Sequence, residues 1–166
     1  MKKLIILGVA IIFVMTFIFV MSNKDVNSSD SQSKKVVMEI VNKYDKITNA
    51  DNETLAKHQT KSFIEEANHF FRKFSHAFIY FVLGILVLDF LITLNKSSFY
   101  LCNLYSLLFV FIYACTDEYH QTFVAGRTGK FSDVLIDSVG ALIGCIIFSI
   151  CYILIMKRKK RKMCQK

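Results

Sequence analysis

Long apolar blocks separated by polar segments organise this chain. A helix needs roughly 20 apolar residues to cross a bilayer core of about 30 Å. Four blocks approach or exceed that length, and they run from Leu4 to Met21, from about Ser75 to Leu94, from about Phe99 to Cys115 and from Val134 to Met156. The first and third are slightly short, which local thinning of the bilayer accommodates. The pattern therefore predicts four transmembrane helices.

The first block also has one feature of a secretory signal peptide, because Lys2 and Lys3 precede it. Its apolar run, however, is longer than the roughly 7–15 residues usual in such peptides. No A-x-A-like cleavage site follows Met21. We therefore expect residues 1–21 to remain in the protein as an uncleaved membrane anchor.

The segment 22–71 connects the first two blocks, and we expect it to be extracytoplasmic. It begins with a polar, low-complexity stretch, and apolar residues then recur at helical spacing from Val37 to Ile47, which predicts an amphipathic helix. The sequence Ser62-Phe63-Ile64-Glu65 has the form of a capping box and predicts the start of a further helix. No Pro interrupts the chain after it, so we expect this helix to continue into the second span.

Composition and charge place the protein in a membrane and orient it there. The chain is 54% hydrophobic with a formal net charge of +8, and its mean hydropathy of +0.41 is higher than a soluble domain of this size needs. If both termini are cytoplasmic, the whole excess of Lys and Arg lies inside, mostly in the tail 157–166. This distribution satisfies the positive-inside rule. It predicts cytoplasmic termini, and a tail that contacts anionic lipid headgroups rather than nucleic acid.

The cysteine pattern indicates neither a disulfide framework nor a metal site. The five cysteines lie in or beside the spans or in the tail, with no C-x-x-C pair, and they are Cys102, Cys115, Cys145, Cys151 and Cys164. We interpret them as small apolar side chains that fill space between helices. The sequence predicts no cofactor and no metal, and it indicates no particular oligomeric state.

Two groups of polar residues flank the spans, and the predicted topology puts both on the outer side. Residues spaced three or four apart share a helical face. The candidate site that results is an outer-facing polar pocket made of Lys73, His76, Tyr80, Asp117, Glu118, His120, Gln121, Arg127, Lys130, Asp133 and Asp137. An acidic residue inside a membrane span requires a partner, and for Asp137 we expect Arg127, Lys73 or His76. Asp89 is expected to pair with Lys96 or to reach the inner interface.

Glycines in the spans predict close helix packing. Gly140 and Gly144 form a GxxxG pattern in the fourth block, which lets another helix approach closely. Gly84 lies on the polar face of the second block. Gly126 and Gly129 permit a short return between the third and fourth helices, which should therefore be antiparallel neighbours.

These residues resemble the VanZ-like family of small bacterial membrane proteins. The resemblance rests on the order Lys73, His76, Tyr80, Gly84, then Asp117-Glu118-x-His120-Gln121, Gly126-Arg127, Asp133, Asp137, Gly140 and Gly144, and it spans most of the chain, with its core at 72–156. The chain departs from the family's usual pattern at three places. It has Ala125 where Pro is common before the Gly-Arg, Ile79 where a glutamate often precedes the tyrosine, and Asn23-Lys24 where a Gln is often found. The resemblance implies a protein of the bacterial cell membrane. The family's founding member is associated with low-level teicoplanin resistance, without the ligase chemistry that rebuilds the drug's target.

The sequence therefore predicts an all-α, four-helix transmembrane bundle with an extracytoplasmic amphipathic helical segment between its first two helices. Its expected partners are the lipid bilayer and either a lipid-linked cell-wall precursor or a lipoglycopeptide. Arg127, Lys130 and Lys73 would hold anionic oxygens. Two alternatives stay open: a membrane enzyme that acts on a lipid phosphate through Asp117, Glu118, His120 and His76, and a purely structural polar core.

Overall fold

The fold of the chain is all-α. The computed structural model describes residues 1–23, 55–94, 98–124 and 129–164, with the backbone alone for 55–69 and 164. Within these ranges there is no strand, and the helices are α1 (Lys2–Ser22), α3 (Leu55–Leu94), α4 (Phe99–Gln121) and α5 (Phe131–Cys164). Each contains a stretch long and apolar enough to cross a membrane. The predicted all-α bundle with four spans is confirmed.

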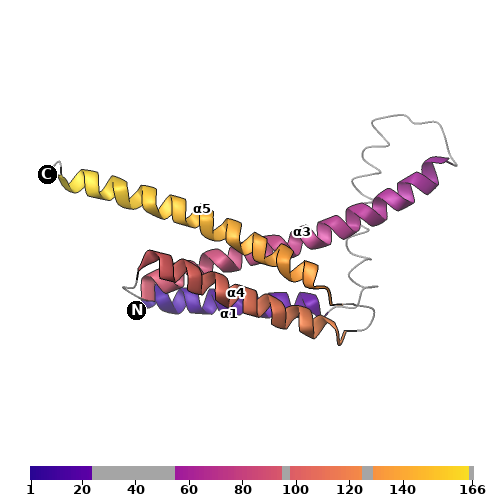
Figure 1. The fold of residues 1–166 in the computed structure, drawn as a ribbon, viewed down its shortest axis with the longest axis horizontal. Coiled ribbons are helices and arrows are strands. Elements are labelled where there is room, and N and C mark those ends of the chain that lie inside the picture. The colour runs from indigo at the N-terminus through magenta and orange to yellow at the C-terminus, as the bar shows by residue number, and fades with distance from the viewer. Residues whose placement is uncertain (24–54, 95–97, 125–128, 165–166) are drawn as a thin grey trace.

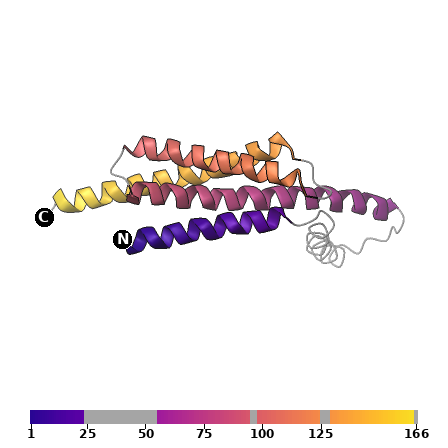
Figure 2. The same cartoon turned by 90° about the horizontal axis from the view of Figure 1, so that it is seen from below.

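Consecutive helices of the bundle run in opposite directions, so both termini lie at the same end (Figure 1). We call this the proximal end, and the opposite end, where α1 and α4 finish and α5 begins, the distal end. α3 and α4 each contact the other three helices, whereas α1 and α5 do not contact each other in the described part of the chain. Turned by 90°, the bundle shows α1 on one side of α3, and α4 and α5 on the other (Figure 2).

The helices extend further than the apolar blocks indicate. α3 is a single helix of 40 residues, as expected, but it begins at Leu55 rather than at the capping box of Ser62. The residues before Ser62 include Leu, Ala, Lys and Gln, which favour helix, so the backbone hydrogen bonding continues through the capping motif. The amphipathic helix predicted between Val37 and Ile47 lies outside the described residues.

The other two helices after α1 are also longer than predicted. α4 runs to Gln121 rather than ending near Cys115, and α5 includes most of the basic tail up to Cys164. Polar residues end an apolar block without ending a helix, because the helix depends on its backbone hydrogen bonds. As a result the polar residues from Asp117 to Gln121 are presented on a rigid helix.

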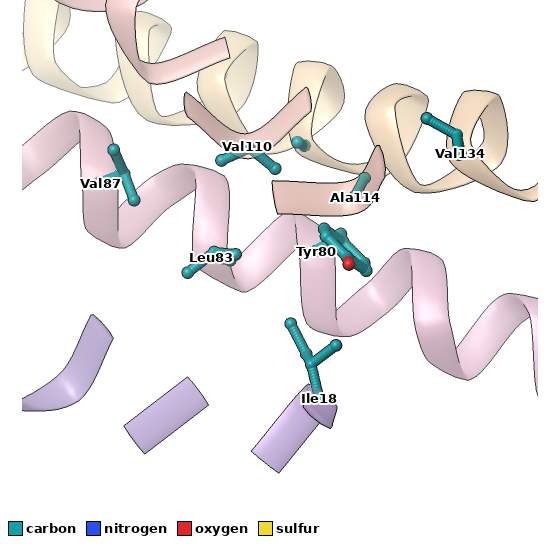
Figure 3. Packing of buried hydrophobic residues seen from close by; sticks show 8 residues of the cluster. Ile18, Tyr80, Leu83, Val87, Val110, Ala114 and Val134 are labelled. Carbon is teal, nitrogen blue, oxygen red and sulfur yellow. The ribbon is translucent and has the colours of Figure 1, made fainter. Parts of the chain in front are cut away.

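The hydrophobic core lies along α3, which faces α1, α4 and α5 in turn. The buried side chains of this core come from all four helices and are Ile18, Tyr80, Leu83, Val87, Val110, Ala114, Val134 and Ala141. Figure 3 shows Tyr80 of α3 between Ile18 of α1 and Ala114 of α4. Many large apolar side chains on the outer faces of the helices remain exposed, as expected for surfaces that contact lipid.

Small residues bring α3 and α5 into direct backbone contact. A Cβ atom placed on Gly140 would overlap the carbonyl oxygen of Ala77, and one placed on Gly144 would overlap that of Phe81. On α3, a Cβ atom placed on Gly84 would lie 2.9 Å from the carbonyl oxygen of Ala141 of α5. The GxxxG pattern thus forms the crossing point of α3 and α5.

Candidate functional site at the distal end

The two polar groups of the sequence meet at the distal end of the bundle. Lys73 lies on α3 and Asp133 in the first turn of α5, and the Lys73 Nζ is 2.7 Å from Asp133 Oδ1. Both side chains are about one quarter exposed, at 26% and 28%. Ser132 also donates a hydrogen bond from its hydroxyl to Asp133 Oδ1, at 3.2 Å. The ion pair therefore joins the second and fourth spans at the rim of the cluster.

Asp117 lies deeper, on α4, and is only 4% exposed. Its Oδ2 atom accepts hydrogen bonds from the Ser22 hydroxyl at 2.9 Å and from the Gln121 amide nitrogen at 3.1 Å. Ser22 is the last residue of α1, so this carboxylate connects the first and third spans. The other carboxylate oxygen, Oδ1, is buried and has no hydrogen-bond partner among the described residues.

Glu118 is buried beside Asp117 and receives a hydrogen bond from the turn that follows α4. The backbone nitrogen of Lys130 donates to Glu118 Oε1 at 2.7 Å. The turn approaches α4 so closely that a Cβ on Gly129 would lie 2.9 Å from the Glu118 carbonyl oxygen. A side chain at position 129 would therefore collide with α4, and a glycine is needed there. The side chain of Lys130 is exposed, so its ammonium lies at the surface while its backbone holds Glu118.

Tyr80 and Asp137 complete the buried part of the cluster. Tyr80 is fully buried, and Asp137 is 4% exposed. Asp137 lies within electrostatic range of four charged groups. These are the carboxylates of Asp117, Glu118 and Asp133 and the ammonium of Lys73. Of the three partners that the sequence offered for Asp137, Lys73 forms an ion pair with Asp133, one helical turn from Asp137. Arg127 lies outside the described residues, and His76 is half-buried on α3.

Comparison with known proteins identifies the family of the chain. A family model described as VanZ/LLP1 matches residues 7–152, from the beginning of α1 to near the end of the apolar part of α5. The chain belongs to the VanZ/LLP1 family. No curated protein and no solved structure matches it. The resemblance that the sequence showed is thereby confirmed at the level of the family.

The two candidate histidines of this VanZ/LLP1 chain lie on α4 and α3. The ring of His120 packs against Phe19 of α1, with centroids 4.5 Å apart, and its Nδ1 has no hydrogen-bond partner among the described residues. His76 is half-buried on α3. Ile79, which stands where the family often has a glutamate, packs against the hydrophobic core. No acid is therefore contributed from that position.

Asp89 belongs to the proximal end of the VanZ/LLP1 bundle and not to the site. Its Oδ1 lies 2.8 Å from Nζ of Lys3 on α1, and the hydroxyl of Thr93 donates to the same oxygen at 3.4 Å. The expected partner, Lys96, lies outside the described residues. The sequence did not suggest Lys3, because pairing across two helices depends on how α1 packs.

Ser22 is the residue of the cluster that sequence reasoning missed. Its only signal is its position directly after the first apolar block, where many polar residues follow. Among the described residues no group of three or more His, Cys, Asp and Glu side chains is arranged to hold a metal ion. The described cluster offers hydrogen bonds and charge, with the carboxylates of Asp117 and Glu118 buried and the ammonium groups of Lys73 and Lys130 nearer the surface.

Proposed function

We propose that this VanZ/LLP1 protein lowers susceptibility to teicoplanin-type lipoglycopeptides without rebuilding their target. In this proposal the distal end faces the outside of the cell, and its polar cluster binds either the drug or a lipid-linked wall precursor. The observation that carries the proposal is the convergence of polar side chains from all four helices, Ser22, Lys73, Asp117 and Asp133 among them, at one end of a small membrane bundle. The family's association with teicoplanin resistance supplies the class of ligand.

The rim of the cluster offers suitable contacts for such ligands. Lys73 is partly exposed and Lys130 is exposed, so both ammonium groups are accessible to phosphate or carboxylate oxygens. Lys presents a compact charge with rotatable donors, which suits anionic groups of varied geometry. The amide of Gln121 and the carboxylate of Asp117 add acceptors and donors deeper in the bundle. A ligand with anionic and amide groups matches this arrangement.

A second candidate function is purely structural, and one observation favours it. The bonds of Asp117 and Glu118 found in the structure are internal, to Ser22, Gln121 and the backbone of Lys130. Networks of this kind hold helices together and need no ligand. Substitution of a buried member would then reduce the amount of folded protein, since leaving a buried group unpaired costs about 1–3 kcal/mol or more.

Drug susceptibility measured together with membrane abundance tests the proposal. Cells that express the wild type should tolerate more teicoplanin than cells with an empty vector. Lys130→Ala should give an intermediate tolerance at normal abundance, because losing one charged contact weakens binding about tenfold. Asp89→Asn, at the opposite end of the bundle, is the matched control and should behave as the wild type.

Other outcomes would contradict the proposal in distinct ways. Wild type and empty vector giving equal tolerance would exclude the resistance function. Tolerance that falls only in proportion to abundance, in Lys130→Ala and Glu118→Gln alike, would assign the cluster to structure. Complete loss with Glu118→Gln at normal abundance, with Lys130→Ala unaffected, would favour the enzyme alternative.

A further inference from the structure

Glu118 is buried, but it is bonded to a residue whose side chain lies at the surface. It belongs to the last turn of α4 and is only 7% exposed. Its Oε1 atom accepts a hydrogen bond from the backbone nitrogen of Lys130 at 2.7 Å, and the side chain of Lys130 is exposed. A carboxylate at this depth is not accessible to a ligand at the rim, whereas the ammonium of Lys130 is. Glu118 therefore acts on the rim through another residue.

The backbone of Lys130 is held from two helices. Lys130 lies directly before α5, which begins at Phe131, and its carbonyl oxygen accepts a hydrogen bond from the nitrogen of Asp133 at 2.8 Å. Its own nitrogen is one of the donors that the start of a helix leaves without a partner inside that helix. Glu118 supplies the acceptor from α4. The two bonds fix the Lys130 backbone against α4 on one side and α5 on the other.

The turn before α5 packs onto the same residue of α4. A Cβ atom placed on Gly129 would lie 2.9 Å from the carbonyl oxygen of Glu118. The side chain of Glu118 then bonds the next residue of the turn, Lys130. Hydrogen bonds to a carboxylate are stronger than those between neutral groups. Close packing and a strong hydrogen bond thus hold two successive residues of the turn to one residue of α4.

The other lysine of the rim is held differently. Lys73 lies inside α3, which is a continuous helix, and its ammonium is paired with Asp133. Its backbone is fixed by the hydrogen bonds of that helix. Lys130 precedes its helix, so the position of its backbone depends on the contact with Glu118.

We propose that Glu118 is the positioning residue for Lys130, so that the rim presents its ammonium groups at a fixed spacing. This inference rests on the proposed function, in which Lys73 and Lys130 bind anionic groups of the ligand. It gives Glu118 neither contact with the ligand nor a catalytic role. A contact group that is fixed in advance does not have to be ordered when the ligand binds. Removing the acceptor should therefore weaken binding even though both ammonium groups remain.

The position of residue 130 can be measured without any ligand. In a full-length chain without its native cysteines, cysteines that replace Lys130 and Leu104 carry spin labels. Leu104 is 59% exposed and lies 14 residues before Glu118 on α4, or about 21 Å at about 1.5 Å per residue. Double electron–electron resonance of the protein in lipid nanodiscs gives the distribution of distances between the labels. The distribution should be narrow with Glu118 and with Glu118→Gln, whose amide oxygen still accepts, and it should broaden with Glu118→Met, which keeps the length of the side chain without its oxygens.

Two further variants separate the contact from other effects of substitution. Gly129→Ala leaves the carboxylate intact but pushes the turn away from Glu118, so it should broaden the distribution as Glu118→Met does. It also keeps the test informative if Glu118→Met does not fold. Thr116→Ala, on the same helix, removes a hydroxyl that donates to the Tyr113 carbonyl oxygen, and it should leave the distribution narrow.

Teicoplanin tolerance, corrected for membrane abundance, measures the consequence for function. Glu118→Met should lower tolerance to the level of Lys130→Ala, and Glu118→Gln should stay close to the wild type. The double variant of Glu118→Met with Lys130→Ala should be no more sensitive than Lys130→Ala alone. A positioning residue has no further effect once the group that it positions is gone, so the two substitutions are not additive.

The outcomes distinguish this inference from the function on which it rests. A distribution that stays narrow in Glu118→Met would overturn the inference. Equal loss of tolerance in Glu118→Gln and Glu118→Met at normal abundance would do the same, because it would make the carboxylate itself the acting group. A double variant clearly more sensitive than Lys130→Ala would give Glu118 a separate role and would also overturn it. A distribution that broadens as expected, in a protein whose wild type gives no more tolerance than an empty vector, would contradict the proposed function alone.

Discussion

Gly140 is the residue on which the contact between α3 and α5 depends most directly. Its neighbour across the crossing is a backbone carbonyl, that of Ala77, and backbone has no alternative rotamer to adopt. Gly144 repeats this arrangement one turn later against Phe81. A methyl group at either position must therefore separate the two helices. Gly8 on α1 differs, because its nearest neighbour is the side chain of Phe90 at 3.9 Å.

We predict that Gly140→Ala destabilises the bundle by about 1–3 kcal/mol, the usual cost of overpacking a tight interface. Gly8→Ala should leave stability unchanged or raise it by up to about 1 kcal/mol, because no close contact is affected and Ala favours the helix. Thermal unfolding of the purified proteins in detergent measures both. If Gly140→Ala unfolded at the same temperature as Gly8→Ala, the close crossing described here would be wrong.

Residue-scale features were predictable from the sequence where they depend on local geometry. Asp117 and Gln121 are four residues apart, and their hydrogen bond agrees with the shared helical face that this spacing predicts. The pairs Lys73 with Asp133 and Ser22 with Asp117 were not predictable individually. They join different helices, so they depend on the rotation and height at which those helices pack.

At the scale of elements, α1 is held to the bundle by polar contacts along its whole length. At the distal end Ser22 donates to Asp117, and at the proximal end Lys3 pairs with Asp89. Between them the Tyr113 hydroxyl donates to the Met15 carbonyl oxygen at 2.7 Å. Most side chains of α1 face outward, and few are buried. These contacts supplement the apolar packing of Ile18 and its neighbours against the core.

We predict that the mature protein keeps residues 1–22. Cleavage after Met21 would separate Ser22 from the membrane helix that positions it against Asp117. Intact mass spectrometry of the protein purified from membranes measures the outcome, with a chain engineered to carry an A-x-A cleavage site after Met21 as the control. A native mass equal to that of the processed control would show that α1 is a signal peptide.

Hydropathy predicted the number of spans because an apolar run of sufficient length has few other uses. It did not predict where helices end, since α3 starts at Leu55 and α4 continues to Gln121. The polar residues at those ends remain helical because their backbone hydrogen bonds are satisfied within the helix. Only a signal such as Pro or an exposed Gly would have marked an earlier end.

For the whole molecule, the even number of described spans puts both termini at one end of the bundle. The orientation of that end in the membrane is a prediction from the charge distribution. The tail of α5 carries a run of Lys and Arg from Lys157 to Lys162, whereas the distal end combines acidic and basic groups. The positive-inside rule therefore predicts that the proximal end faces the cytoplasm.

We predict that a cysteine replacing Lys130, in a chain without its native cysteines, reacts with a membrane-impermeant thiol reagent in intact cells. A cysteine replacing Lys166 should react only after the cells are permeabilised. A fluorescent protein fused at the C-terminus, which matures in the cytoplasm, gives an independent measurement. Labelling in the reverse order would invert the orientation, and the polar cluster would then face the cytoplasm.

Two ion pairs among the described residues lie toward opposite ends of the bundle and bracket its apolar middle. Lys73 and Asp89 lie on the same helix, and about 16 residues at about 1.5 Å each place them about 24 Å apart along its axis. A typical hydrocarbon layer is about 30 Å thick. The lysine stems extend outward toward the headgroups and cover part of this difference, and slight local thinning of the bilayer covers the rest. We therefore expect the protein to be more stable in bilayers whose acyl chains are somewhat shorter than usual.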